Sequence, residues 1–189
     1  MNAIDLSGYA GLVALCLLTL NILLGLLLSV RYHPKKHFPY RQFNTFKIHN
    51  WTGYIALCVA GLHPTLLLFS STAGFGVRDV LFPVWSPSQP LENTLGAVAF
   101  YLLSAVVVTS YFRVELGRRT WKRLHYLAYG AAAFFFVHGL LTDPNLNNAP
   151  FNPLDAEKVL VEVCLLLVIV GVGMRIRYAL KKNERVKTL

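Results

Sequence analysis

The sequence predicts an all-α integral membrane protein built as one bundle of five transmembrane helices. Of its 189 residues, 55% are hydrophobic and only 14% are charged. The apolar residues occur in blocks about twenty residues long, the length that an α-helix needs to cross the hydrocarbon core of a bilayer. Five blocks have this character, at residues 8–30, 49–69, 94–112, 121–141 and 159–178.

These five spans use nearly the whole chain, so we expect residues 1–189 to form a single transmembrane domain. The connecting segments are short, which leaves no room for a soluble catalytic domain. The residues before the first span, MNAIDLS, include Asp5 but no lysine or arginine. Since a signal peptide carries a basic leading region and a shorter apolar run, this block is expected to stay in place as the first span.

The cationic residues are concentrated on one side of the predicted bundle. Sixteen of the 18 lysines and arginines fall within residues 31–47, 113–123 and 175–187, whereas the opposite side has Arg78 and Lys158. The positive-inside rule then puts the N-terminus outside and the C-terminus in the cytoplasm of a plasma membrane, here a bacterial inner membrane. This distribution accounts for the net charge of +9 without nucleic acid, and the predicted partner of the basic segments is membrane lipid.

The first span contains one strongly polar interior residue, Asn21. An unpaired amide in lipid is costly, so Asn21 is expected to hydrogen-bond to a neighbouring helix. The following segment holds His33 and His37 among prolines and cations. These two histidines are predicted to be solvated and not to bind a metal.

The second and fourth spans each carry two histidines near their ends. His49 and His63 are fourteen residues apart, and His125 and His138 are thirteen apart. At 1.5 Å per residue, either spacing corresponds to about 20 Å along a helix, so one metal ion cannot bind both members. Because the second and fourth spans run in the same direction, His125 is expected at the depth of His49 and His138 at the depth of His63.

The two spacings differ in helical phase. Fourteen residues return an ideal helix to within about 40° of its starting face, whereas thirteen residues rotate it by about 220°. His125 and His138 therefore do not share a face of an ideal helix. The fourth span is expected to absorb the difference through Gly130, through a local bulge, or through different histidine rotamers.

A facing pair of histidines is the ligand set that haem requires. A zinc ion takes four protein ligands, and neither predicted level offers a cysteine or an interior carboxylate beside its two histidines. Haem supplies four nitrogens and lacks two axial ligands. We therefore predict two stacked bis-histidine haems b, held non-covalently because no CxxCH motif is present. Hydrogen-bonded structural histidines and another metal are the alternatives.

Two further features lie on the predicted outer side. Residues 70–93 are rich in proline and aromatic side chains, which is typical of a flap at the membrane interface, or alternatively of a cover near His63. The span 94–112 has only hydroxyl polarity and is interpreted as bundle wall. Glu162, near the outer end of the last span, is either an interfacial residue or part of a proton or quinol site.

This pattern resembles the ferric-reductase-like transmembrane domain shared by NADPH oxidases, metalloreductases and the haem membrane subunit of periplasmic methionine sulfoxide reductase. The resemblance covers roughly residues 49–178 and depends on the two histidine spacings and the run RTWKRLHYLAY. It implies an inner haem on His49 and His125 and an outer haem on His63 and His138. The family commonly has six helices, and its oxidases continue into flavin and nicotinamide domains, which this chain does not show.

The expected function is transmembrane electron transfer through two haems b. The donor would be a cytoplasmic-side flavoprotein or quinol, with quinone as a further candidate cofactor, and the acceptor an extracytoplasmic redox partner. In that role the chain is an electron-transferring oxidoreductase subunit without catalytic side chains of its own. One alternative is direct reduction of ferric iron or oxygen at the outer haem. Another is a non-redox scaffold or transporter with structural histidines.

Overall fold

The structure, a computed structural model, describes residues 2–30, 44–143, 145–146 and 152–187. His33 and His37 lie outside the described residues. Every regular element in the described part of the chain is a helix. The long helices are α1 (Ala3–Ser29), α3 (Thr45–Thr65), α5 (Pro90–Tyr111), α6 (Arg113–His125), α7 (Leu127–Leu141) and α8 (Ala156–Lys187). The short ones are η1 (Leu66–Phe69), α4 (Val77–Leu81) and η2 (Pro83–Trp85).

Within the described residues, five stretches of helix are long and apolar enough to cross a membrane, which confirms the five predicted spans. Their bounds are Ala3–Ser29, Thr45–Phe69, Pro90–Tyr111, Arg113–Leu141 and Ala156–Lys181. Each begins a few residues before its predicted start, because the polar residues at the helix ends are helical as well. A capping box supports this at the first start, where Asn2 and Asp5 exchange side-chain and backbone hydrogen bonds.

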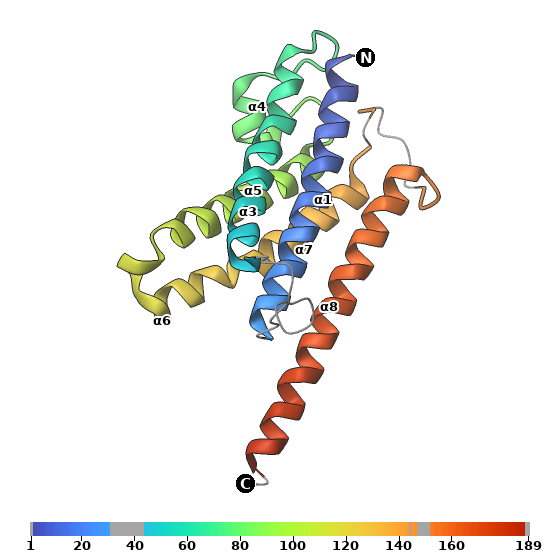
Figure 1. Cartoon of the computed structure of the whole chain (residues 1–189). Coiled ribbons are helices and arrows are strands. Elements are labelled where there is room, and N and C mark those ends of the chain that lie inside the picture. Colours follow the sequence, from blue (N-terminus) through green and yellow to red (C-terminus); the bar gives the residue numbers. More distant parts are fainter. Residues whose placement is uncertain (1, 31–43, 144, 147–151, 188–189) are drawn as a thin grey trace.

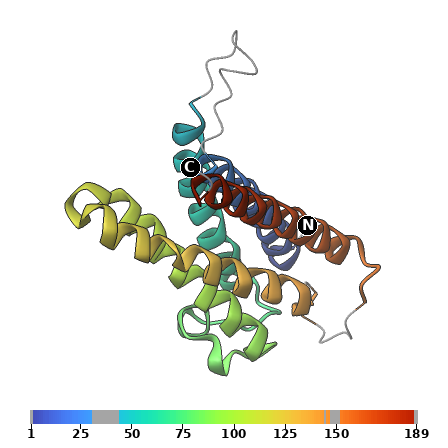
Figure 2. The same ribbon diagram turned by 90° about the horizontal axis from the view of Figure 1, so that it is seen from below.

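The first four spans form two helical hairpins that face each other. In the first hairpin α1 packs along α3, and in the second α5 packs along α7. The second hairpin crosses the first obliquely, and the two chain termini lie at opposite ends of the molecule (Figure 1). Seen along the bundle, α5, α6 and α7 project to one side of the α1–α3 pair, whereas α8 lies along α1 (Figure 2).

The fourth span is not the single helix predicted over residues 121–141. Its helix begins at Arg113, turns at Gly117, whose φ of 71° is a left-handed value suited to glycine, and is interrupted at Tyr126. Around the interruption, Tyr126 N–H donates to Arg123 O and Tyr129 N–H donates to Tyr126 O, which are three-residue closures. A 3₁₀ turn rotates the chain by about 120° per residue instead of 100°. His125 and His138 are about 140° from sharing a face, and each residue of the turn adds only about 20°, so the turn at Tyr126 accounts for part of the phase difference. Gly130 lies within the regular helix α7.

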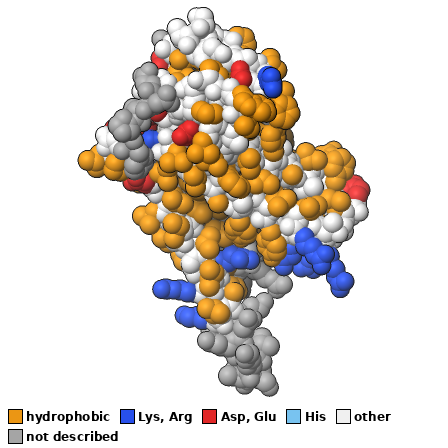
Figure 3. Space-filling view, turned by 180° about the vertical axis from the view of Figure 1, so that it is seen from behind, with side chains coloured by type: hydrophobic (Ala, Val, Ile, Leu, Met, Phe, Trp, Pro, Cys, Tyr) orange, Lys and Arg blue, Asp and Glu red, His pale blue; other side chains and the backbone are white. Residues whose placement is uncertain are grey.

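The packed core lies midway between the two levels of histidines. One cluster joins α1, α7 and α8 and consists of Leu15, Ala132, Phe136, Val161 and Cys164. A second cluster joins α1, α5 and α7 and consists of Leu18, Leu103 and Ala131. Large apolar side chains also cover much of the outer surface, and most of the described lysines and arginines gather toward the end that bears the C-terminus (Figure 3). This surface suits contact with lipid.

Asn21 joins the two helices of the first hairpin, as its sequence context predicted. Its side-chain amide donates to His49 O at 2.5 Å and to Thr52 Oγ1 at 2.8 Å. Gly53 makes room for this amide, since a Cβ there would lie 3.3 Å from Asn21 Nδ2. The bond to His49 O holds the backbone of His49 against α1.

We predict that Asn21→Ala lowers the free energy of unfolding by about 1 kcal/mol, since interhelical hydrogen bonds in membranes are worth about 0.6–1.7 kcal/mol. Thermal unfolding in detergent, followed by circular dichroism, measures the effect. Leu20→Ala is the matched control, because Leu20 directly precedes Asn21 on α1 but its side chain is 46% exposed. Equal losses in the two variants would contradict a structural role for the Asn21 bonds.

Candidate functional site

The structure brings the four predicted histidines together as two facing pairs. His49 of α3 and His125 of α6 have ring centroids 6.3 Å apart and ring planes inclined at 67°. His63 of α3 and His138 of α7 also have centroids 6.3 Å apart, with planes inclined at 65°. Two pairs formed by different segments thus share one geometry. They lie at the two ends of the bundle core, one beyond each end of the packed clusters.

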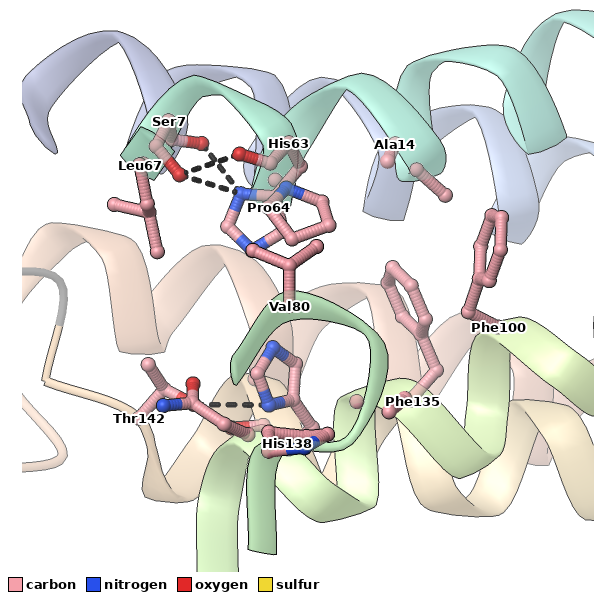
Figure 4. A pocket seen from close by; sticks show the side chains of 18 of the residues that line it. Ser7, Ala14, His63, Pro64, Leu67, Val80, Phe100, Phe135, His138 and Thr142 are labelled. Atoms are coloured by element: carbon pink, nitrogen blue, oxygen red, sulfur yellow. Dashed lines mark hydrogen bonds between the residues drawn. The ribbon is translucent and has the colours of Figure 1, made fainter. Parts of the chain in front are cut away.

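Each imidazole uses its Nδ1 atom for a hydrogen bond to a neighbouring helix. A carbonyl oxygen only accepts, so in three of the four rings Nδ1 carries the proton and Nε2 does not. At the level of His63 and His138, these Nε2 atoms point toward one another across a cavity (Figure 4). The Nδ1 partners are Asn21 O for His49 at 3.1 Å, Ser7 O for His63 at 2.7 Å, Glu92 O for His138 at 2.8 Å and Ser110 Oγ for His125 at 3.1 Å.

A glycine four residues after each carbonyl lets the ring reach it. In a helix, residue i+4 lies directly above residue i, and its Cβ tilts back toward the carbonyl of residue i. A Cβ at Gly11 would lie 3.1 Å from the ring of His63, and one at Gly25 would lie 3.3 Å from the ring of His49. A Cβ at Gly96 would lie 2.9 Å from the ring of His138. We call each carbonyl with its glycine a ring seat: Ser7 with Gly11, Asn21 with Gly25, and Glu92 with Gly96.

The ring seats were missed by the sequence reasoning, although a signal for them exists. Gly11 and Gly25 of α1 are fourteen residues apart, the spacing of His63 and His49 in the antiparallel helix beside them. On α5, the same spacing separates Gly96 from Ser110. The interpretation of residues 94–112 as bundle wall was therefore incomplete, because α5 supports His138 at one end and His125 at the other.

A cavity of about 430 Å³ lies at the level of His63 and His138. The segment 70–93 covers it, since Phe75, Val80, Leu81 and Pro83 are among its lining residues. The predicted alternative of a cover near His63 is therefore what the structure shows for this segment. The cover is fastened to α5, because the hydroxyl of Tyr101 donates to Leu81 O.

A second set of hydrogen bonds joins the cover to the segment after α7. The side-chain amide of Gln89 donates to Asp143 O at 2.9 Å and accepts from Asp143 N at 2.8 Å. Both residues are buried. The paired bonds satisfy polar backbone groups that would otherwise be costly to bury. They also hold α5 and α7 together at the end of the hairpin that bears His138.

Lys158 is a buried cation beside the same cavity. It is 6% exposed and donates from Nζ to Gly139 O at 3.0 Å and to Thr142 O at 2.5 Å. These carbonyls belong to the last turn of α7 and the residue that caps it, where a cation also complements the helix dipole. Thr142 in turn lies 3.0 Å through Oγ1 from His138 Nδ1. Lys158 thus stabilises the helix end that carries this histidine.

Glu162 does not take part in this site. Its side chain is exposed, and it is not among the residues that line the cavity. Of the two roles predicted for Glu162, an interfacial residue agrees with this position.

No group of three or more histidine, cysteine, aspartate or glutamate side chains that could hold a metal ion is found within the described residues. Each level there offers two imidazoles to a metal. A bare zinc ion needs more protein ligands than that. The site therefore suits a metal that arrives with other donors of its own.

Lys158→Met is predicted to lower the free energy of unfolding by about 1–3 kcal/mol, because it leaves the carbonyls of Gly139 and Thr142 without their buried donor. Thermal unfolding in detergent measures the loss. Lys181→Met is the control, since Lys181 is an exposed residue of the same helix. A loss no larger than that of the control would show that the two carbonyls do not depend on Lys158.

One of the comparisons with known proteins gave a match. The sequence model described as the ferric reductase like transmembrane component matches residues 10–137, which is more than half of the chain. The matched segment contains His49, His63 and His125 and ends one residue before His138. Neither the curated proteins nor the solved structures gave a match. With the expected resemblance confirmed by this match, the chain belongs to the family of ferric-reductase-like transmembrane components.

Proposed function

We propose that this chain carries electrons across a membrane through two haems b, one between His49 and His125 and the other between His63 and His138. Membership of the family favours transmembrane electron transfer. The histidine pairs supply the chemistry for it, because each level presents two imidazoles to one metal.

The observation that carries the proposal is the 6.3 Å between ring centroids in both pairs. Metal–imidazole bonds are about 2.0–2.1 Å long, and a ring centre lies about 1.1 Å from its nitrogen, so two imidazoles on opposite sides of one metal have centres about 6.3 Å apart. Two imidazoles bonded directly to each other through nitrogens about 3 Å apart would have centres near 5 Å. The spacing fits a shared metal better than a structural hydrogen bond.

The hydrogen bonds at Nδ1 support the same conclusion. Metal-binding histidines generally donate their other ring N–H to a carbonyl, which fixes the tautomer and raises the basicity of the ligand. His49, His63 and His138 each do so. In a non-redox scaffold with structural histidines, the Nε2 atoms of His63 and His138 would face only a mostly apolar cavity.

Haem, when bound, supplies one-electron chemistry. The chain's own residues hold and orient it: the ring seats fix the axial imidazoles, and the mostly apolar walls exclude water. At the outer level the cover formed by α4 and η2 closes the cavity, and Tyr101 and Gln89 keep it in place. If haem is held by both histidines of a pair, no coordination position would remain open on its iron, so oxygen or ferric iron would have to receive electrons through the haem edge. Transfer through the haem edge serves a redox partner as well as ferric iron or oxygen, so direct reduction is the alternative to delivery to a redox protein.

The direction of transfer follows from the proposed orientation. With the basic end in the cytoplasm of a bacterial inner membrane, His49 and His125 lie on the donor side, and His63 and His138 lie on the acceptor side. An inside-negative potential favours outward electron movement by about 2.3 kcal/mol per charge per 100 mV. The proposed donor is a cytoplasmic-side flavoprotein or a quinol, and the proposed acceptor is an extracytoplasmic redox protein.

We predict two haems b per chain in the purified protein, measured by pyridine haemochrome assay against protein mass. His63→Ala and His138→Ala should each lose the same haem, and His49→Ala and His125→Ala the other, because either partner's loss removes an axial ligand. Redox titration identifies which haem remains. His33→Ala is the control and should retain both.

Two outcomes would contradict this proposal. A wild-type protein without a Soret band, when haem is supplied during expression, would exclude haem at both levels. Loss of the same haem from His49→Ala and His138→Ala would show that the pairs are assigned wrongly, even if two haems are bound.

Orientation is tested with single cysteines in a background in which Cys16, Cys58 and Cys164 are replaced by alanine. We expect Ser71→Cys in the cover segment to react with a membrane-impermeant maleimide in intact cells. Lys181→Cys, at the basic end of α8, should react only after the cells are opened. Both side chains replaced are exposed, so accessibility within the fold does not limit either reaction. The reverse labelling pattern would invert the proposed direction of electron flow.

A further inference from the structure

Three of the four ligand histidines sit in the same kind of ring seat, and His125 does not. On α5, the seat at His138 consists of the carbonyl of Glu92 and the missing side chain of Gly96. Fourteen residues further along α5, the corresponding positions are Val106 and Ser110. A side chain therefore stands at His125 where each of the other rings meets a glycine.

The hydroxyl of Ser110 takes the place of the carbonyl. Ser110 Oγ lies 3.1 Å from His125 Nδ1, and Trp121 Nε1 donates to the same oxygen at 3.3 Å. The Trp121 ring also packs on His125, with centroids 5.1 Å apart and planes inclined at 34°. One alcohol oxygen thus accepts from Trp121 and, when Nε2 of His125 binds iron and Nδ1 carries the proton, from His125 as well. His49, the other ligand of the inner pair, donates to the peptide carbonyl of Asn21.

The difference bears on how strongly each imidazole donates electrons to iron. A strong acceptor at Nδ1 draws the N–H proton away and gives the ring more imidazolate character, which favours ferric iron and lowers the reduction potential. A peptide carbonyl is a stronger acceptor than an alcohol, and the hydroxyl of Ser110 is already shared with Trp121. The ring of His125 is therefore a weaker donor than one in a complete ring seat.

We propose that Ser110 and Trp121 are positioning residues that set the reduction potential of the inner haem above the value that a complete ring seat at His125 would give. The inference rests on the proposed haem sites. It concerns one ligand of one haem, so the outer haem serves as an internal reference in the same molecule.

Three substitutions in the full-length, haem-loaded protein test the proposal by redox titration of both haems. Ser110→Gly supplies the missing glycine of a ring seat, so that the carbonyl of Val106, which also accepts from Thr109 Oγ1 at 3.2 Å, can accept from His125, and the inner potential should fall. Trp121→Phe keeps an aromatic ring on His125 but removes the competing N–H, and the inner potential should also fall. Ser110→Ala removes the acceptor while its Cβ still blocks the carbonyl, and the inner potential should rise.

The outer potential should not move in any of the three variants. Ser104→Ala is the matched control, because the hydroxyl of Ser104 on the same helix donates to Phe100 O and not to a histidine. It should leave both potentials unchanged. If Ser110→Ala loses the inner haem, the downward shifts in Ser110→Gly and Trp121→Phe still decide the question.

Unchanged inner potentials in Ser110→Gly and Trp121→Phe, with two haems retained, would overturn this inference and leave the proposed function standing. The same holds for upward shifts in both variants, which would indicate a merely structural disturbance. A wild-type chain that binds no haem would overturn the proposed function itself, and this inference with it. Haem stoichiometry, measured on each preparation, separates these cases.

Discussion

The hydrogen bond from each histidine Nδ1 to a neighbouring helix is the interaction on which the rest of the structure depends. In an apolar interior, neither nitrogen of an imidazole can be left without a partner cheaply. A bond at Nδ1 settles the tautomer, fixes the ring plane and leaves Nε2 directed at the facing ring. Since a helix carbonyl is already engaged along its own helix, a ring reaches it only where the covering side chain is absent, and this explains the glycines at positions 11, 25 and 96.

The same constraint gives the molecule its two-hairpin construction. In each hairpin one helix carries the histidines and the other provides their Nδ1 partners. Helix α1 provides two ring seats for α3, and α5 provides one ring seat for His138 and the hydroxyl of Ser110 for His125. The two ring seats of α1 are fourteen residues apart, which matches the fourteen-residue spacing of His49 and His63 on α3. In the second hairpin the histidines are thirteen residues apart, and the tight turn at Tyr126 makes up part of the difference in helical phase. Both pairs then reach the same separation of 6.3 Å.

Beyond this shared plan, the two levels differ in their surroundings. The level of His63 and His138 is enclosed by the cover segment and has the buried ammonium of Lys158 near the end of α7. The level of His49 and His125 has the Ser110 and Trp121 arrangement and lies nearer the basic end of the molecule. Under the proposed function, such differences would give the two similar sites unequal reduction potentials.

Much of this protein was determined by its sequence alone. Apolar blocks of bilayer length specify five spans, and histidines at matched depths of two parallel spans specify which residues can meet, because helical rise is regular enough to carry a depth along twenty residues. The tertiary structure decided what depends on neighbouring helices. In the sequence, Gly11, Gly25 and Gly96 look like ordinary small residues of membrane helices, and only the structure shows the histidine ring beside each. Lys158 also looks like a surface charge, and only the structure shows that it donates to carbonyls at the end of α7. The break at Tyr126 likewise escaped the periodicity of the sequence. A tight turn of a few residues leaves no composition signal.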